Sequence, residues 1–197
     1  PPDVLMLLLS VDTERVLPTV KSRCQIIELH PMAIDRVVKI LTERGVGEEK
    51  ADVIGRLSGG CIGWAIEAAR EPAVLAGVHQ RLARIAGVIE ETLEARFDYA
   101  ENLARRFQRD RVTGREELYL WLRWFRDILL IQHGQADRVV NVSWNDTLTR
   151  QADALSPAEV VLWLRLVTES IGLLERNANA RLTLDVLMLE APRLSTT

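Results

Sequence analysis

The sequence predicts a mainly α-helical protein that begins with a short α/β segment. Residues 1–30 hold two apolar runs of strand length, and from residue 32 onward the apolar residues recur at helical spacing. Twice a Ser or Thr is followed three residues later by Glu, which is typical of helix N-termini. We therefore expect an α/β segment (1–30), a unit of three short helices (31–72) and a larger helical bundle (73–197).

The first thirty residues are predicted to form a strand, a helix and a strand. Val4–Leu9 is continuously apolar, as in a parallel strand that is covered on both faces. Asp12–Val20 is a short helical connection that Pro18 interrupts. Gln25–Leu29 is the second strand and ends before Pro31.

Three short helices are predicted to follow. The first has apolar residues at i, i+3, i+4 and i+7 from Ile34, and Gly45 supplies its C-terminal stop. The second extends from Glu48 to Leu57 and is broken by Ser58–Gly60. The third has one apolar face, and Pro72 closes the unit.

The remainder of the chain is predicted to be helical throughout. Ala73–Ile89 and Leu93–Arg109 are amphipathic. Thr113–Glu116 matches a capping box and is expected to open a long apolar helix. Ser156–Glu159 matches a second capping box, with a proline at the first helical position. Arg181–Leu189 is predicted to form the last helix.

The charge of the chain argues against autonomous DNA binding. The 197 residues carry a net charge of −3, whereas proteins that hold DNA by themselves display a basic stripe. The densest basic cluster is interleaved with Glu101 and Asp110, so we interpret it as a solvated helix face. It consists of Arg105, Arg106, Arg109 and Arg111. No apolar run approaches the roughly 20 residues that span a bilayer, so no membrane partner is expected.

The chemistry-bearing residues do not indicate a catalytic or metal site. Cys24 and Cys61 are too few for a disulfide framework or a four-ligand zinc site, which favours reduced thiols and a cytoplasmic location. His30, His79 and His133 have no ligand-like spacing. No Gly-rich phosphate loop, nucleophile elbow or H-E-x-x-H motif is present. We expect no metal and no cofactor in this chain.

The segment Thr19–Gln25 (Thr-Val-Lys-Ser-Arg-Cys-Gln) precedes the second predicted strand. It resembles the Ser-Arg-Cys motif of bacterial clamp-loader subunits of the AAA+ family, in which Pro18 and Gln25 also have counterparts. Val4–Ser10 is similar to the sensor-1 strand of the same AAA+ core. The resemblance identifies the first thirty residues as a truncated AAA+ core.

The resemblance implies that Arg23, with Ser22 and Cys24 of the motif, is an arginine finger. In this family the motif arginine reaches ATP–Mg bound by a neighbouring subunit, where a planar guanidinium can make forked contacts to phosphate. The alternative from the residues alone is an arginine that caps a helix C-terminus beside a strand.

A second segment, Leu57–Ile66, is similar to the sensor-2 segment of the family. ATP-binding members usually place an arginine where this chain has Trp64. The resemblance therefore implies that the chain holds no nucleotide of its own, and it favours a delta-prime type over an ATP-hydrolysing gamma type. Trp64 can equally be a core or interface residue after a glycine turn, and both interpretations can hold together.

A third resemblance is the longest. Trp121–Ile131, a loop with Asn141, and Asn177–Asp185 are similar to the collar domain of delta-prime-type subunits. The implied architecture is a truncated AAA+ core (1–30), a three-helix lid (31–72) and a helical collar for oligomerisation (73–197). Arg126 and Asp127 are expected to cap or bridge helices. The core is expected to hold Trp121, Trp124 and Trp163.

The resemblance also implies partners and a function. The collar would join gamma/tau and delta subunits of the DNA polymerase III clamp loader, and the whole complex would place the sliding clamp on primed DNA during replication. The chain itself would not be an enzyme, although its parent holoenzyme is a DNA polymerase. Two alternatives stay open, namely a gamma/tau-type ATPase whose phosphate loop lies upstream, and a generic helical interaction module.

The start of the chain leads to one structural expectation. Because Pro1 is followed at once by an apolar run, we interpret the chain as a C-terminal fragment of a longer protein. In AAA+ cores the strands that match Val4–Leu9 and Gln25–Leu29 flank another strand, which is missing here. Bare strand edges are costly. The two strands are therefore expected to pair with each other or with another chain.

Overall fold

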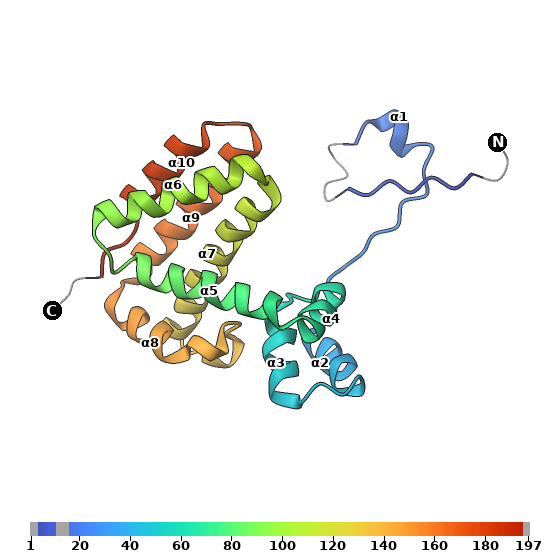
Figure 1. The fold of residues 1–197 in the computed structure, drawn as a ribbon, viewed down its shortest axis with the longest axis horizontal. Helices are drawn as coiled ribbons and strands as arrows, with labels where there is room; N and C mark the ends of the chain where they lie inside the picture. The colour runs from blue at the N-terminus through green and yellow to red at the C-terminus, as the bar shows by residue number, and fades with distance from the viewer. Residues whose placement is uncertain (1–3, 11–15, 195–197) are drawn as a thin grey trace. The chain divides into compact units, whose positions relative to one another are not determined.

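A computed structural model describes residues 4–10 and 16–194, and this part of the chain contains helices and no β-strand (Figure 1). The mainly α prediction is confirmed. The chain divides after Pro31 into two units. None of the helices in the described ranges is long and apolar enough to cross a membrane.

The first unit lacks the two predicted strands. Val4–Leu9 and Gln25–Leu29 have no regular secondary structure, and neither pairs with the other. A strand requires a partner for its backbone N–H and C=O groups, and no described segment supplies one. The apolar run therefore remains exposed, with Leu9 95% accessible.

The described part of the predicted helical connection between these runs contains one short helix. Helix α1 covers Pro18–Lys21, so Pro18 begins the helix instead of interrupting it. Proline suits the first helical position because the N–H that it lacks would be unbonded there. Residues 12–15 of the predicted helical connection lie outside the described residues.

The second unit begins with three helices at the predicted positions, α2 (Ile34–Glu43), α3 (Glu48–Leu57) and α4 (Ile62–Arg70). Gly45 follows α2 with a φ of 87°, a conformation that favours glycine. The three helices share a core of their own, made of Val37, Leu41, Ala51, Ile54, Ala65 and Ala68.

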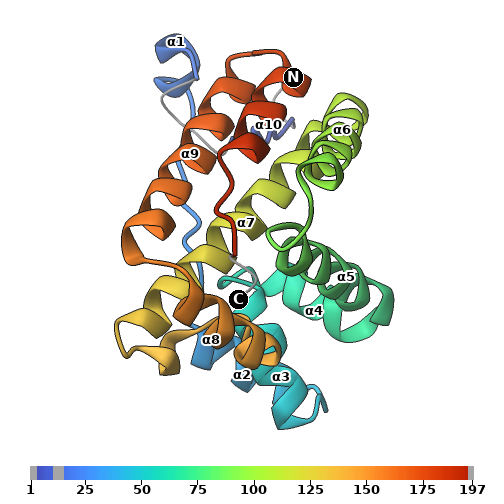
Figure 2. The same ribbon diagram turned by 90° about the vertical axis from the view of Figure 1, so that its left-hand side faces the viewer.

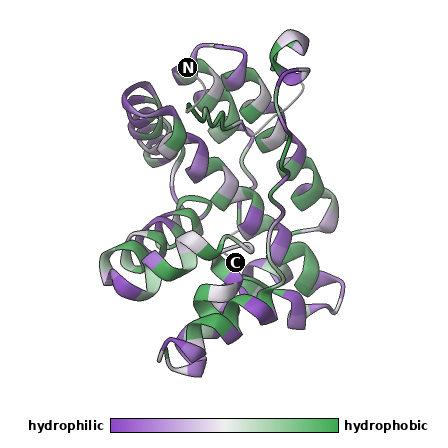
Figure 3. Ribbon diagram, turned by 90° about the vertical axis from the view of Figure 1, so that its right-hand side faces the viewer, coloured by the Kyte–Doolittle hydropathy of each residue, from purple (hydrophilic) through white to green (hydrophobic). Residues whose placement is uncertain are grey.

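Six further helices complete the second unit, and four of them are longer than α2, α3 and α4. In Figures 1 and 2, α6 lies along α10 and α7 lies along α9. Figure 3 shows that these helices carry hydrophobic and hydrophilic positions on the same ribbon, as amphipathic helices do. They are α5 (Pro72–Val88), α6 (Leu93–Arg109), α7 (Arg111–Gln132), α8 (Asn145–Ala154), α9 (Pro157–Glu175) and α10 (Ala180–Leu189).

Three tryptophans form the centre of this bundle, which confirms their predicted core position. Trp121 and Trp124 are fully buried and Trp163 is 1% exposed. The rings of Trp121 and Trp163 meet edge to face, 5.5 Å between centroids. Two of the indole N–H groups have acceptors: Trp121 Nε1 donates to the Tyr99 hydroxyl (2.8 Å) and Trp124 Nε1 to Gln151 Oε1 (2.8 Å).

One of the two predicted capping boxes is confirmed and the other is wrong. Ser156 and Glu159 cap α9 reciprocally, as predicted. Helix α7 begins at Arg111, two residues before Thr113, and Asp110 caps it by accepting the N–H of Val112 at 2.9 Å. Thr113 already lies inside the first turn, so its hydroxyl donates to Asp110 (2.6 Å) instead of capping the helix.

The segment between α7 and α9 holds structure that the sequence did not predict. Two 3₁₀ turns, η2 (Ala136–Arg138) and η3 (Val142–Trp144), surround the predicted loop with Asn141 and lead into α8, a helix whose bounds the sequence did not define. Asp127 on α7 is buried, and its Oδ2 accepts the backbone N–H of Asn141 and the Asn141 side-chain amide, both at 2.8 Å. Asp127 therefore bridges α7 to this loop.

Candidate functional site

The predicted finger residue lies on an exposed turn at the end of α1. The N–H of Arg23 donates to Val20 O (3.0 Å) and that of Cys24 to Lys21 O (3.3 Å). The hydroxyl of Ser22 donates to Thr19 O at 3.3 Å. The motif therefore folds as one closed turn with the three residues Ser22, Arg23 and Cys24 at the surface.

The guanidinium of Arg23 makes no hydrogen bond or ion pair with any residue that the structure describes. It does not contact the carbonyls at the end of α1, as an arginine that capped this helix would. All five of its N–H donors remain free for an acceptor outside the described chain. Chemically, such a group suits the forked recognition of phosphate or carboxylate.

The second predicted segment is a tight turn between α3 and α4. Gly59 (φ 56°) and Gly60 (φ 86°) adopt the left-handed conformation there, which explains the glycine pair. Ser58 stabilises the turn, because its hydroxyl donates to Gly55 O (2.7 Å) and accepts the N–H of Gly60 (3.1 Å). Helix α4 begins directly after this glycine turn, and Trp64 is its third residue.

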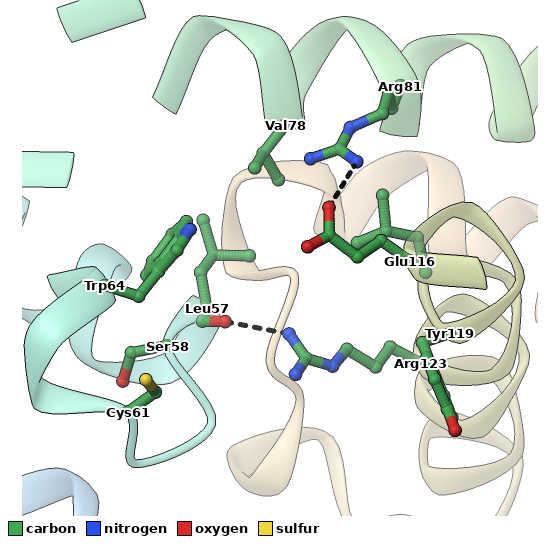
Figure 4. A pocket seen from close by; sticks show the side chains of 10 residues that line it. Leu57, Ser58, Cys61, Trp64, Val78, Arg81, Glu116, Tyr119 and Arg123 are labelled. Atoms are coloured by element: carbon green, nitrogen blue, oxygen red, sulfur yellow. Dashed lines mark hydrogen bonds and ion pairs between the residues drawn. The ribbon is translucent and has the colours of Figure 1, made fainter. Parts of the chain in front are cut away.

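Trp64 is partly buried and packs against both hydrophobic cores of the second unit. It lines a pocket of about 260 Å³ together with residues from α3, α4, α5 and α7 (Figure 4). The other lining residues are Leu57, Ser58, Cys61, Val78, Arg81, Glu116, Tyr119, Leu120 and Arg123.

The two cations of this pocket already have partners. Arg81 pairs with Glu116 at 3.4 Å, and Arg123 Nη1 donates to Leu57 O at 2.8 Å (Figure 4). Burial lowers the pKa of Arg123, and Asp127 opposes that shift. The pocket thus offers an apolar indole and two engaged guanidiniums, an arrangement that fixes α3 against α7 and leaves few donors for a phosphate group.

Sequence reasoning missed two arginines that join the unit of α2, α3 and α4 to the helical bundle. Besides Arg123, Arg56 Nη1 donates to Asp137 O (3.1 Å) and Val139 O (3.0 Å). Their acceptors are backbone carbonyls far away in the chain, so no local pattern could have revealed them.

The basic cluster around α6 and α7 is largely engaged within the chain. Arg105 pairs with Glu101, and Arg106 reaches the buried Glu117 at 3.4 Å. Arg111 donates to Asn177 Oδ1 at 2.7 Å. This agrees with its interpretation as a charged helix surface.

An apolar face runs along α9 and α10. The exposed side chains include Leu182 (63% accessible) and Val186 (60%), and a groove of about 290 Å³ lies between the two helices. Glu169 and Glu190 line the same groove. The remaining exposed apolar residues of the face are Leu162, Leu173 and Leu189. We call this set of residues the α9–α10 face.

Within the described ranges, no group of three or more His, Cys, Asp or Glu side chains is placed to hold a metal ion. Cys24 and Cys61 are both exposed and free. Comparison of the chain with protein-family models, curated proteins and solved structures finds no match.

Proposed function

We propose that the chain is the C-terminal part of a delta-prime-type subunit of the bacterial DNA polymerase III clamp loader. It would act in the cytoplasm and help to place the sliding clamp on primed DNA. The observation that carries the proposal is the Ser22–Cys24 motif on an exposed turn, with the guanidinium of Arg23 unpaired among the described residues.

In this role the chain is not itself an enzyme. Arg23 extends to ATP–Mg in a neighbouring gamma/tau subunit, where it offsets the negative charge that develops during phosphoryl transfer. Two features favour this over a gamma/tau-type ATPase. Trp64 stands at the position of the expected sensor-2 arginine, and Arg81 and Arg123 beside it are engaged within the chain.

The α9–α10 face supports a role for the helical bundle as a collar. Exposed apolar side chains that gather on one face of a soluble protein mark interaction surfaces. In the proposed complex this face contacts the collar helices of a gamma/tau or delta subunit, and it buries Leu182 and Val186.

The finger role can be tested in the full-length subunit assembled with its partners. Arg23→Ala should leave assembly intact and slow ATP-driven clamp loading by about 10³-fold, since loss of a finger arginine removes transition-state stabilisation. Arg36→Ala, which removes an exposed arginine of α2, is the matched control and should load clamps normally. Equal loading rates for the two variants would assign Arg23 a structural role.

The collar contact has its own test. Val186→Asp places a charge in the centre of the α9–α10 face and should reduce co-purification with the other subunits. Val112→Asp is the control, because Val112 is 57% accessible on the first turn of α7, outside this face. Normal assembly of the Val186 variant would contradict the collar role of α9 and α10.

A further inference from the structure

A second pocket lies within the unit formed by α2, α3 and α4, and it gathers three cationic side chains. Its volume is about 600 Å³, within the range of sites that hold small ligands or peptide side chains. Arg44, Lys50 and Arg70 line it, and no carboxylate does. Three positive charges without a counter-charge are unusual in a chain whose net charge is −3.

The ends of two helices fix the arginines at this pocket. Arg44 is the C-cap residue of α2, and Arg70 is the last residue of α4. Cations near helix C-termini interact favourably with the helix dipole, so both positions suit an arginine, and both side chains are exposed. Neither guanidinium forms a hydrogen bond or ion pair with the residues in the described ranges.

The third cation is held by the backbone. Lys50 Nζ donates to Ala69 O at 3.3 Å, which keeps the ammonium beside the end of α4 while two of its donors stay free. The acidic residues Glu48 and Glu49 in the first turn of α3 do not line the pocket.

The rest of the pocket lining is apolar. It consists of Leu41, Val46, Ile66 and Ala69, together with Gly45 and Gly47. A bare phosphate group would use the cations and leave the apolar lining uncovered. A ligand that satisfies the whole lining combines negative charge with an apolar group.

We propose that this pocket binds an acidic peptide segment of a partner protein, with an apolar side chain against the apolar lining and carboxylates on Arg44, Lys50 and Arg70. Guanidinium groups bind carboxylates through two parallel hydrogen bonds, which gives such a contact strength and direction. The inference goes beyond the proposed clamp-loader function and does not depend on it, because it rests only on residues of α2 to α4.

The test uses the whole chain and a labelled synthetic peptide in which leucine and phenylalanine are flanked on each side by two aspartates. Fluorescence anisotropy should show saturable binding. Arg44→Gln and Arg70→Gln should each raise the Kd for the peptide about tenfold. This is the change in affinity expected when one hydrogen-bonded contact between charged groups is lost. Arg84→Gln, an exposed arginine of α5 with the same change in charge, should bind like the unaltered chain.

Further peptides and anions separate the possible outcomes. A peptide with serine in place of both apolar residues should bind at least tenfold more weakly, and inorganic tripolyphosphate should not displace the acidic peptide. The proposal is overturned if the acidic peptide does not bind, if the Arg44/Arg70 double variant binds it equally well, or if the serine peptide is equivalent. Tripolyphosphate that binds tightly and displaces the peptide would instead define a polyphosphate site.

Discussion

Gly114 lies where α7 packs tightly against Phe107 of α6. A Cβ atom at this position would lie 2.7 Å from Phe107 Cα, closer than real contacts of this kind, and the obstacle is backbone that cannot rotate away. We expect Gly114→Ala to lower the free energy of unfolding by about 1–3 kcal/mol, as overpacked sites do. Urea denaturation of the two proteins measures the difference.

A second glycine provides the control. Gly172 lies inside α9, and a Cβ added there would meet no atom within 4 Å. Gly172→Ala should therefore raise stability by about 0.4–1 kcal/mol, because alanine restricts the unfolded chain without a clash. Equal destabilisation by both alanine substitutions would show that the effect at Gly114 does not come from a clash with Phe107.

Single residues also show what sequence could and could not predict. The core positions of Trp121, Trp124 and Trp163 were predicted from the sequence, because large aromatic side chains in an apolar helix are usually buried. The roles of Arg56 and Arg123 did not follow. Their carbonyl acceptors lie between 66 and 83 residues away in the chain, and only the folded structure brings them together.

Among the elements, most of the helices were predicted correctly, whereas α8 was missed and the two predicted strands were wrong. A helix satisfies its own backbone hydrogen bonds, so periodicity and capping residues define it locally. A strand depends on a partner, and Val4–Leu9 has none among the described residues despite its apolar composition. Local competition also matters, because Asp110 displaced Thr113 as the cap of α7.

The capping box of α9 leads to a prediction on pH. Hydrogen bonds from the Ser156 hydroxyl and backbone N–H lower the pKa of Glu159 from its ordinary value of 4.5. A carboxyl whose pKa is lower in the folded state stabilises the fold above the unfolded-state pKa, and this contribution is lost as pH falls through the folded-state pKa. Part of the acid sensitivity of the protein should therefore come from Glu159.

Unfolding midpoints measured from pH 7 down to pH 3 test this. Ser156→Ala should cost about 0.5–2 kcal/mol at pH 7, the usual effect of losing a cap. Glu159→Gln should lose stability at pH 7 and converge with the unaltered protein at the acidic end. Glu169→Gln, an exposed glutamate of the same helix, controls for net charge. Parallel pH curves for both glutamine variants would exclude a specific contribution from the box.

At the scale of the second unit, two hydrophobic cores meet where the α2–α4 unit joins the bundle. Trp64 and Leu75 pack against both cores, and otherwise the α2–α4 core and the bundle core consist of different residues. Arg56 and Arg123 add hydrogen bonds to backbone carbonyls across this junction. The α2–α4 unit is thus joined to the bundle by the hydrogen bonds of these two arginines and by apolar contacts of Trp64, Val53 and Leu57, the last of which is buried in the bundle core.

We therefore predict that the junction can be weakened without unfolding the bundle. Arg56→Met combined with Arg123→Met keeps the apolar stems and removes the bonds, at a cost of about 1 kcal/mol for each of these partly exposed groups. Hydrogen exchange should then quicken for the amides of α2, α3 and α4, because local opening no longer breaks those bonds. Amides of α7 and α9 should keep their protection. Arg84→Met, at an exposed position of α5, should change neither set. Equal acceleration throughout Met32–Thr197 would mean that the two cores open together as one cooperative unit.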